Sequence, residues 1–264
     1  MIDPQERDPE EELPDEGELS DKMSFLEHLD ELRTRLIYSI ISIAVAFVVT
    51  FYYYAPIFYF MEAPLRKVMP PGQDKLYFIA PTEGFGLSMK VAFVAAIFLA
   101  SPFLIWQLWL FISPGLYRKE KKYVLPFLLS STVLFLSGGA FGYYILLPGT
   151  LKFLIYFNPG MTYLPKASEY FGIVTWIMLG MGGIFQLPVL IAFLSIFGIV
   201  TPRFLIHNFK YAFLLAFVLG AVISPTGDPF NLMIYSVPLV VLYLVGIGVS
   251  FVFAKLRKKR ERGL

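Results

Sequence analysis

The sequence predicts an all-α integral membrane protein with six transmembrane helices, and its composition and its pattern both lead to that class. Hydrophobic residues make up 57% of the 264 residues and charged residues only 16%, and the mean hydropathy is +0.65. A water-soluble domain exposes so large a share of its surface that it cannot bury this much apolar side chain. The apolar residues are also gathered into six segments, which is the pattern of membrane-spanning helices.

A helix needs about 20 mostly apolar residues to cross a bilayer, and the first four segments reach that length. The fifth is short for a full crossing, and the sixth follows it after a turn of a few residues, which indicates a tight helical hairpin. An apolar run between the third and fourth segments predicts a short amphipathic helix in the membrane interface. The six segments are about 36–60, 85–112, 123–147, 170–199, 209–223 and 230–253, and the run lies in 149–169.

The two ends of the chain differ from the membrane domain, which we expect to occupy 23–253. Residues 1–22 are acidic and contain proline but no apolar core, so they predict a disordered tail and neither a signal peptide nor a transit peptide. Residues 254–264 form a basic tail. The stretch from Ser24 to Glu27 fits a capping box, which predicts a helix that begins at Ser24.

The distribution of positive charge predicts that both termini are cytoplasmic. With six crossings, the termini and the second and fourth connections share one face, which carries fifteen of the 22 Lys and Arg residues, against six on the opposite face. Loops rich in positive charge stay on the cytoplasmic side of a membrane. The tails 1–22 and 254–264 are therefore expected inside.

Prolines and polar side chains interrupt the apolar segments. Each proline removes a backbone donor and tends to kink a helix, which would suit a concave wall, although proline is also commoner in membrane helices generally. Gln107 is expected to join helices, whereas Gln186 is left open between that role and a functional one. The four prolines near or inside spans are Pro102, Pro126, Pro188 and Pro238.

Two carboxylates on the predicted inner face are candidates for a binding site. In HLDELRTRL, residues 28–36, Glu31 and Arg35 stand four residues apart on one helix face, and Glu120 is the lone acid in a basic loop. The ordinary interpretation is an ion pair worth about 0.2–0.5 kcal/mol and a locally neutralised loop. The functional interpretation is that both carboxylates face a basic ligand. Asp228, in the outer turn, is by default a solvated turn residue.

Several function classes are excluded by what the sequence lacks. There is no cysteine, no phosphate-binding loop and no HExxH motif around His28 or His207, and no chain of acids crosses the apolar segments. The net charge of +2 gives no reason to expect nucleic acid. The sequence therefore predicts a binding scaffold with no catalytic residues, metal or cofactor. The alternative is a secondary transporter for small solutes or ions, which would need an ionisable pair at the midplane.

Five stretches also carry a family resemblance: FLEHLDELRTRL at 25–36, APL at 63–65, FISPGLYRKEKKYVLPFLLSS at 111–131, FQLPVLIAFLSIFGIVTP at 185–202 and ISPTGDPFN at 223–231. Together they resemble TatC, the multispanning subunit of the twin-arginine, Sec-independent protein translocase. The resemblance implies a glove-shaped scaffold in the plasma (inner) membrane of a prokaryote that binds twin-arginine signal peptides of folded precursors. It also implies an oligomeric complex with the single-span subunits TatA and TatB, and transport driven by the proton-motive force.

The resemblance assigns roles to individual residues. Glu31 and Glu120 look like the carboxylates that meet the two signal-peptide arginines, and Arg33 is another important position of the first motif. Phe111 and Pro114 would shape the adjoining loop.

The resemblance extends to the outer side and to the fourth span. Pro64 would fix the first outer loop, and Asp228 is a structural or partner-contact position. The family often has Glu where this chain has Gln186, so a contact there would use neutral hydrogen bonds. Leu232 stands near a position where some relatives carry a polar residue, so no partner contact is assigned to it.

The free energy of an Arg–Glu pair indicates how buried the expected site must be. A fully exposed Arg–Glu pair contributes only about 0–1 kcal/mol, too little to select one peptide among many basic segments. We therefore expect the carboxylates in a partly desolvated concavity, where a close pair is worth about 4 kcal/mol before desolvation costs. The apolar part of the peptide would lie along the helical wall, and the short hairpin would thin the bilayer.

Overall fold

The computed structural model describes residues 16–70, 75–112, 124–157 and 163–261. Among these residues there is no sheet, only an isolated parallel bridge between Tyr77 and Lys166. The all-α fold class is therefore confirmed. The helices in chain order are α1 (Glu16–Tyr52), α2 (Tyr54–Val68), α3 (Glu83–Ile112), α4 (Val124–Phe141), the π-helical turn η3 (Gly142–Leu146), α5 (Leu147–Tyr156), α6 (Ala167–Ile184), α7 (Leu187–Ile196), α8 (Pro202–His207), α9 (Phe209–Ile223) and α10 (Pro229–Glu261).

The apolar helices match the expected number of spans. Within the described residues, five stretches are long and apolar enough to cross a membrane, and α9 is a shorter sixth. The 15 residues of α9 rise only about 22 Å, less than the roughly 30 Å hydrocarbon core. α10 is not short, since it runs for 33 residues. The long stretches are Glu27–Tyr52, Glu83–Ile112, Leu125–Tyr156, Ala167–Ile196 and Pro229–Lys255.

Three boundaries differ from the sequence prediction. The first span ends at Tyr52, because the chain breaks at Tyr53 and α2 begins as a separate helix. The third span continues through η3 and α5 to Tyr156, so the apolar run after residue 149 ends a span and is not a separate interfacial helix. The capping-box start was also wrong, because α1 begins at Glu16 and Ser24 lies inside it.

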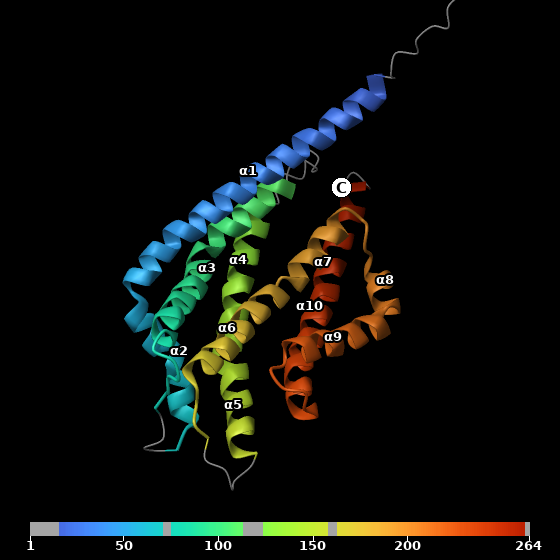
Figure 1. Cartoon of the computed structure of the whole chain (residues 1–264). Coiled ribbons are helices and arrows are strands. Elements are labelled where there is room, and N and C mark those ends of the chain that lie inside the picture. Colours follow the sequence, from blue (N-terminus) through green and yellow to red (C-terminus); the bar gives the residue numbers. More distant parts are fainter. Residues whose placement is uncertain (1–15, 71–74, 113–123, 158–162, 262–264) are drawn as a thin grey trace, which may run out of the picture.

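α1, α2 and α3 lie at one side of the bundle and α8, α9 and α10 at the other, with α4, α5 and α6 between them (Figure 1). α1 packs along α3, α4 packs between α3 and α6, and α10 packs against both α7 and α9. We call the end of the bundle at Glu31, Ile112 and Phe253 the inner end, after the predicted orientation, and the opposite end the outer end. The main core lies toward the outer end, where α2, α3, η3, α5 and α6 bury large side chains together.

Two prolines inside helices leave carbonyls that other side chains satisfy. Proline has no N–H to bond the carbonyl four residues earlier. Pro64 in α2 therefore leaves the Phe60 carbonyl without its helical donor, and the Tyr143 hydroxyl of η3 donates to it. In α3, Ser101 Oγ donates to Phe98 O at 2.8 Å, the carbonyl that Pro102 leaves free. These contacts explain how apolar helices tolerate proline where water is excluded.

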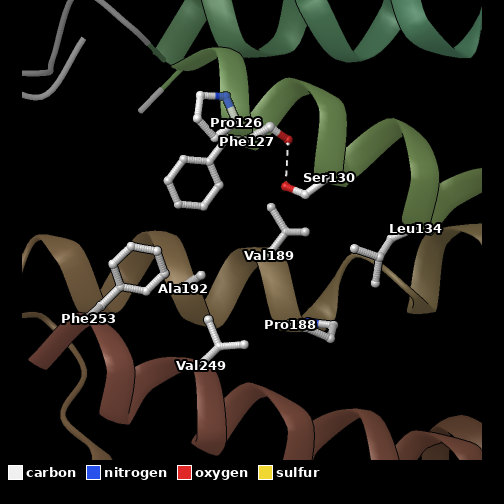
Figure 2. A pocket seen from close by; sticks show the side chains of 9 residues that line it. All are labelled: Pro126, Phe127, Ser130, Leu134, Pro188, Val189, Ala192, Val249 and Phe253. Atoms are coloured by element: carbon white, nitrogen blue, oxygen red, sulfur yellow. Dashed lines mark hydrogen bonds between the residues drawn. The ribbon is translucent and has the colours of Figure 1, made fainter. Parts of the chain in front are cut away.

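An apolar pocket of about 260 Å³ lies between α4, α7 and α10 near the inner end (Figure 2). Phe127 forms one wall, and its ring stacks on Trp109 of α3 at 4.9 Å and on Phe253 of α10 at 6.1 Å. The volume exceeds the roughly 150 Å³ of a cavity that accepts benzene. The pocket is lined by Pro126, Phe127, Ser130, Leu134, Pro188, Val189, Ala192, Val249 and Phe253.

Candidate functional site

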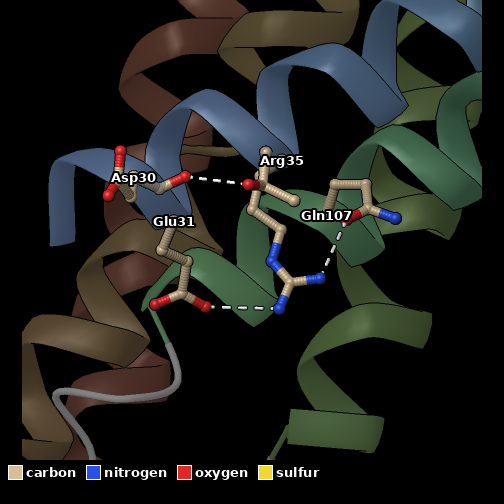
Figure 3. Close-up of polar contacts among 5 residues, drawn as sticks. Asp30, Glu31, Arg35 and Gln107 are labelled. Carbon is tan, nitrogen blue, oxygen red and sulfur yellow. Dashed lines mark hydrogen bonds and ion pairs between the residues drawn. The ribbon is translucent and has the colours of Figure 1, made fainter. Parts of the chain in front are cut away.

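Glu31 lies at the inner end, where α1 meets the last turns of α3. Its Oε1 accepts a hydrogen bond from Nη2 of Arg35 at 3.2 Å, and Nη1 of Arg35 donates to Oε1 of Gln107 on α3 at 3.4 Å. Figure 3 shows both α1 side chains on one helix face, with the guanidinium of Arg35 between the Glu31 carboxylate and Gln107. The spacing of four residues puts Glu31 and Arg35 on that face, and the antiparallel packing of α1 on α3 supplies the third member.

This cluster is half-buried. The side chains of Arg35 and Glu31 are 28% and 25% exposed, and Gln107 is only 6% exposed. Nε of Arg35 is buried, and no described residue forms a hydrogen bond with it. A charged pair so placed interacts more strongly than an exposed pair, because water screens it less.

A second contact joins the same two helices one turn closer to the inner end. The rings of His28 and Phe111 stack with centroids 4.5 Å apart and an interplanar angle of 17°. Glu31 and Phe111, two of the predicted site residues, are therefore brought to one place. Arg33 is exposed and forms no ion pair or hydrogen bond with the described part of the chain.

Two predicted site residues, Glu120 and Pro114, lie outside the described residues, as does the rest of 113–123. The described chain ends at Ile112 of α3 and resumes at Val124 of α4. From the sequence, Arg35 was predicted to form an ion pair and Gln107 to join helices, with no contact between the two. Their hydrogen bond was not predicted, because the sequence pattern does not reveal how α1 is aligned against α3.

Gln186 stands in the break between α6 and α7. Its Nε2 donates to the Ser131 carbonyl of α4 at 3.0 Å, and Ser131 Oγ in turn accepts from Trp109 Nε1 of α3 at 3.3 Å. The break comes directly before Pro188, which occupies the first turn of α7. Gln186 therefore joins the interrupted fourth span to the third, the helix-joining role that the sequence left open.

At the outer end, Asp228 caps α10. Its Oδ1 accepts from Asn231 N at 2.8 Å, and its Oδ2 accepts from Asn231 Nδ2 at 2.8 Å and from the Thr226 hydroxyl. Desolvation alone would raise the pKa of the Asp228 carboxyl, but these hydrogen bonds outweigh it and lower that pKa below its ordinary value. Asp228 is thus a helix cap, where the sequence indicated only a solvated turn. Asn231, fully buried, was missed.

Pro64 lies inside α2 and not in an extended loop, in the connection between the first two spans. No group of three or more His, Cys, Asp or Glu side chains that could hold a metal occurs in the ranges the structure describes.

Comparisons with known proteins agree with this architecture. A family model described as Sec-independent protein translocase protein (TatC) matches residues 27–238. TatC of Koribacter versatilis is 43% identical over 242 residues, covering 90% of this chain and 89% of that protein. TatC of Desulforapulum autotrophicum is 37% identical, covering 91% and 89%.

Solved structures give the same result. A crystal structure of the twin arginine translocase receptor TatC superposes with a TM-score of 0.75 at 33% identity, covering 86% of this chain and 99% of that chain. A second, in DDM, gives 0.76 at 34% identity and covers 84% and 99%.

Proposed function

This chain belongs to the TatC family of Sec-independent protein translocase proteins, and we propose that its inner end binds the twin-arginine signal peptide of folded precursors. As a family member it is a multi-pass inner-membrane core subunit of the twin-arginine translocase. The proposal concerns which of its residues meet the peptide. It rests above all on the half-buried carboxylate of Glu31 between α1 and α3.

The burial of Glu31 supports a selective contact. Guanidinium forms a planar, two-pronged pair with a carboxylate that an ammonium cannot copy. At full exposure such a pair contributes about 0–1 kcal/mol, but the Glu31 side chain is only 25% exposed. Each hydrogen bond to a charged group contributes about 1.5–3 kcal/mol. The second hydrogen bond, which arginine forms and lysine does not, therefore corresponds to at least about a tenfold preference for arginine.

Glu120 would supply the second carboxylate. It stands eight residues after Ile112 and four before Val124, the ends of α3 and α4 that the structure describes. A chain spans at most about 3.6 Å per residue, which supports our proposal that Glu120 acts at the same inner end as Glu31. Phe111, stacked on His28, would set the direction in which this loop leaves α3, and Pro114 would shape the loop.

The apolar pocket beside the inner end would receive apolar side chains of the same peptide. Its nine lining residues are apolar except Ser130, whose hydroxyl is engaged by the Phe127 carbonyl at 3.1 Å. A signal peptide whose arginines bind at the inner end would therefore place its apolar part against this apolar pocket.

Orientation and partners complete the proposal. The inner end of α1 and the C-terminal end of α10 lie at the same end of the bundle (Figure 1), which supports two termini on one side, and the charge count supports the cytoplasmic side. TatA-like and TatB-like single-span subunits would assemble with the chain in an oligomeric complex. The proton-motive force would drive transport, and α9 would thin the bilayer beside them.

The test is peptide binding to the purified full chain in nanodiscs. Glu31→Gln is expected to weaken a twin-Arg peptide at least tenfold while changing a twin-Lys peptide far less. Asp30→Asn is the matched control, because Asp30 is the exposed neighbouring acid and its loss removes the same charge. Equal losses for both peptides, or an equal effect of Asp30→Asn, would refute the proposal.

A further inference from the structure

The Glu31 carboxylate already has a guanidinium beside it. Nη2 of Arg35 donates to Glu31 Oε1 at 3.2 Å, and no other described residue forms an ion pair with Glu31. A peptide arginine that approaches Glu31 therefore meets a carboxylate with a resident partner of its own chemical kind. The contact lies within one helix, so it is present before any ligand arrives.

The resident pair is incomplete in three respects. It has one N–H···O contact, where a guanidinium and a carboxylate can form two in parallel. Nη1 of Arg35 is directed instead to Gln107 at 3.4 Å, a long hydrogen bond. Nε is buried, and the described chain offers it no partner. Arg35 is therefore held near Glu31 without the geometry that makes such pairs strong.

We propose that Arg35 is an internal competitor for the peptide arginine, and that Gln107 holds it in place; this rests on the proposed function. The incoming guanidinium forms the two-pronged pair with Glu31 and displaces Arg35, which keeps its contact with Gln107. Glu31 is thus never left as an unpaired, half-buried charge, which would be costly. The exchange lowers the affinity of every ligand that uses Glu31 by the same factor, so a ligand that forms a single contact gains little net affinity from Glu31, whereas a ligand that forms the two-pronged pair still gains.

The competitor has a defined thermodynamic signature. Every ligand that binds Glu31 must displace the same arginine. Removing Arg35 therefore raises the affinity for twin-Arg and twin-Lys peptides by the same factor. The pair is partly exposed, and the factor is about fivefold, which corresponds to about 1 kcal/mol. The gain requires the carboxylate, so it disappears when Glu31 is neutral. A purely structural role for Arg35 would instead weaken binding, whatever residue stands at position 31.

The experiment measures the affinity of both peptides by fluorescence anisotropy for the full chain in nanodiscs. The variants are Arg35→Gln, Arg35→Lys and Arg203→Gln, each with Glu31 and with Glu31→Gln. Arg203 is an exposed cation of α8, and its substitution removes one positive charge without touching the cluster. Arg35→Lys cannot form the planar contact to Gln107 but keeps a positive charge beside Glu31. The gain in peptide affinity is therefore smaller than with Arg35→Gln.

The expected result is an equal gain of about fivefold for both peptides with Arg35→Gln, less than twofold with Arg203→Gln, and no gain in the Glu31→Gln background. Peptide affinity that is unchanged or weaker in Arg35→Gln, or a gain in affinity that persists in the Glu31→Gln background, would overturn the proposal that Arg35 competes with the peptide arginine. A wild-type chain that fails to prefer the twin-Arg peptide would instead overturn the proposed function itself, and the competitor with it.

Discussion

The contact between Tyr143 and the Phe60 carbonyl gives the sharpest prediction about stability. Tyr143 is 4% exposed, and its hydroxyl satisfies the carbonyl that Pro64 leaves without a helical donor. Tyr143→Phe keeps the ring stacked on Phe60 at 4.5 Å but removes that donor. Loss of one hydrogen bond to a partly buried carbonyl costs about 1–2 kcal/mol, which lowers the apparent Tm by about 2–8 °C in a chain of this size.

The assay is thermal unfolding in detergent, followed by size-exclusion chromatography after heating. Tyr144→Phe is the matched control, because this neighbouring tyrosine is 62% exposed, and we expect no measurable shift. In a Pro64→Ala background, the backbone at position 64 regains an N–H for the Phe60 carbonyl, so Tyr143→Phe should cost much less. The same Tm loss in both backgrounds would refute the reasoning, because the carbonyl would then not be what Tyr143 stabilises.

Three further predictions concern other helices. Insertion of four leucines into α9, which lengthens it by about 6 Å, should impair transport and leave twin-Arg affinity unchanged; wild-type transport would show that thinning is not needed. Asp228→Ala should lower stability by about 0.5–2 kcal/mol at neutral pH. Because the folded pKa of Asp228 is lowered, its stabilising charge effect is present above the ordinary aspartate range and is lost as the pH falls through the lowered pKa; an undiminished Tm difference in acid would contradict this. Gln186→Leu should lower the Tm through the loss of the Ser131 contact without weakening the peptide; weaker binding at unchanged Tm would indicate a direct contact instead.

The length of an apolar segment predicted the helix boundaries well where a single unbroken helix forms the span. The second and fifth segments were placed within two residues of α3 and α9, because their ends coincide with loss of apolar character. The break at Tyr53 was missed because apolar and aromatic residues continue through it, so the turn into α2 is set by packing against α3 and α5. The extension of the third span to Tyr156 was missed because the apolar run after residue 149 was predicted to be a separate interfacial helix, whereas α5 follows η3 directly and ends the span.

The pairing of Glu31 with Arg35 was predictable from the sequence, but the contact of this pair with α3 was not. Glu31 and Arg35 follow from spacing along one helix. The contact of Arg35 with Gln107, 72 positions away, depends on the register of α1 against α3, which apolar side chains determine collectively. The capping role of Asp228 depends on Asn231 and Thr226 in the same turn, a local signal that the sequence contained and that a search for capping residues before α10 would have found.

The most direct test of the account is photo-crosslinking from beside the two carboxylates to one precursor. A photo-reactive residue at His28, one turn from Glu31, and another at Lys121, next to Glu120, leave both acids in place. The account predicts that both positions crosslink the twin-arginine region of the same signal peptide, and that replacing its two arginines by lysines removes both crosslinks. Crosslinks that survive that replacement, or that form from only one of the two positions, would contradict it.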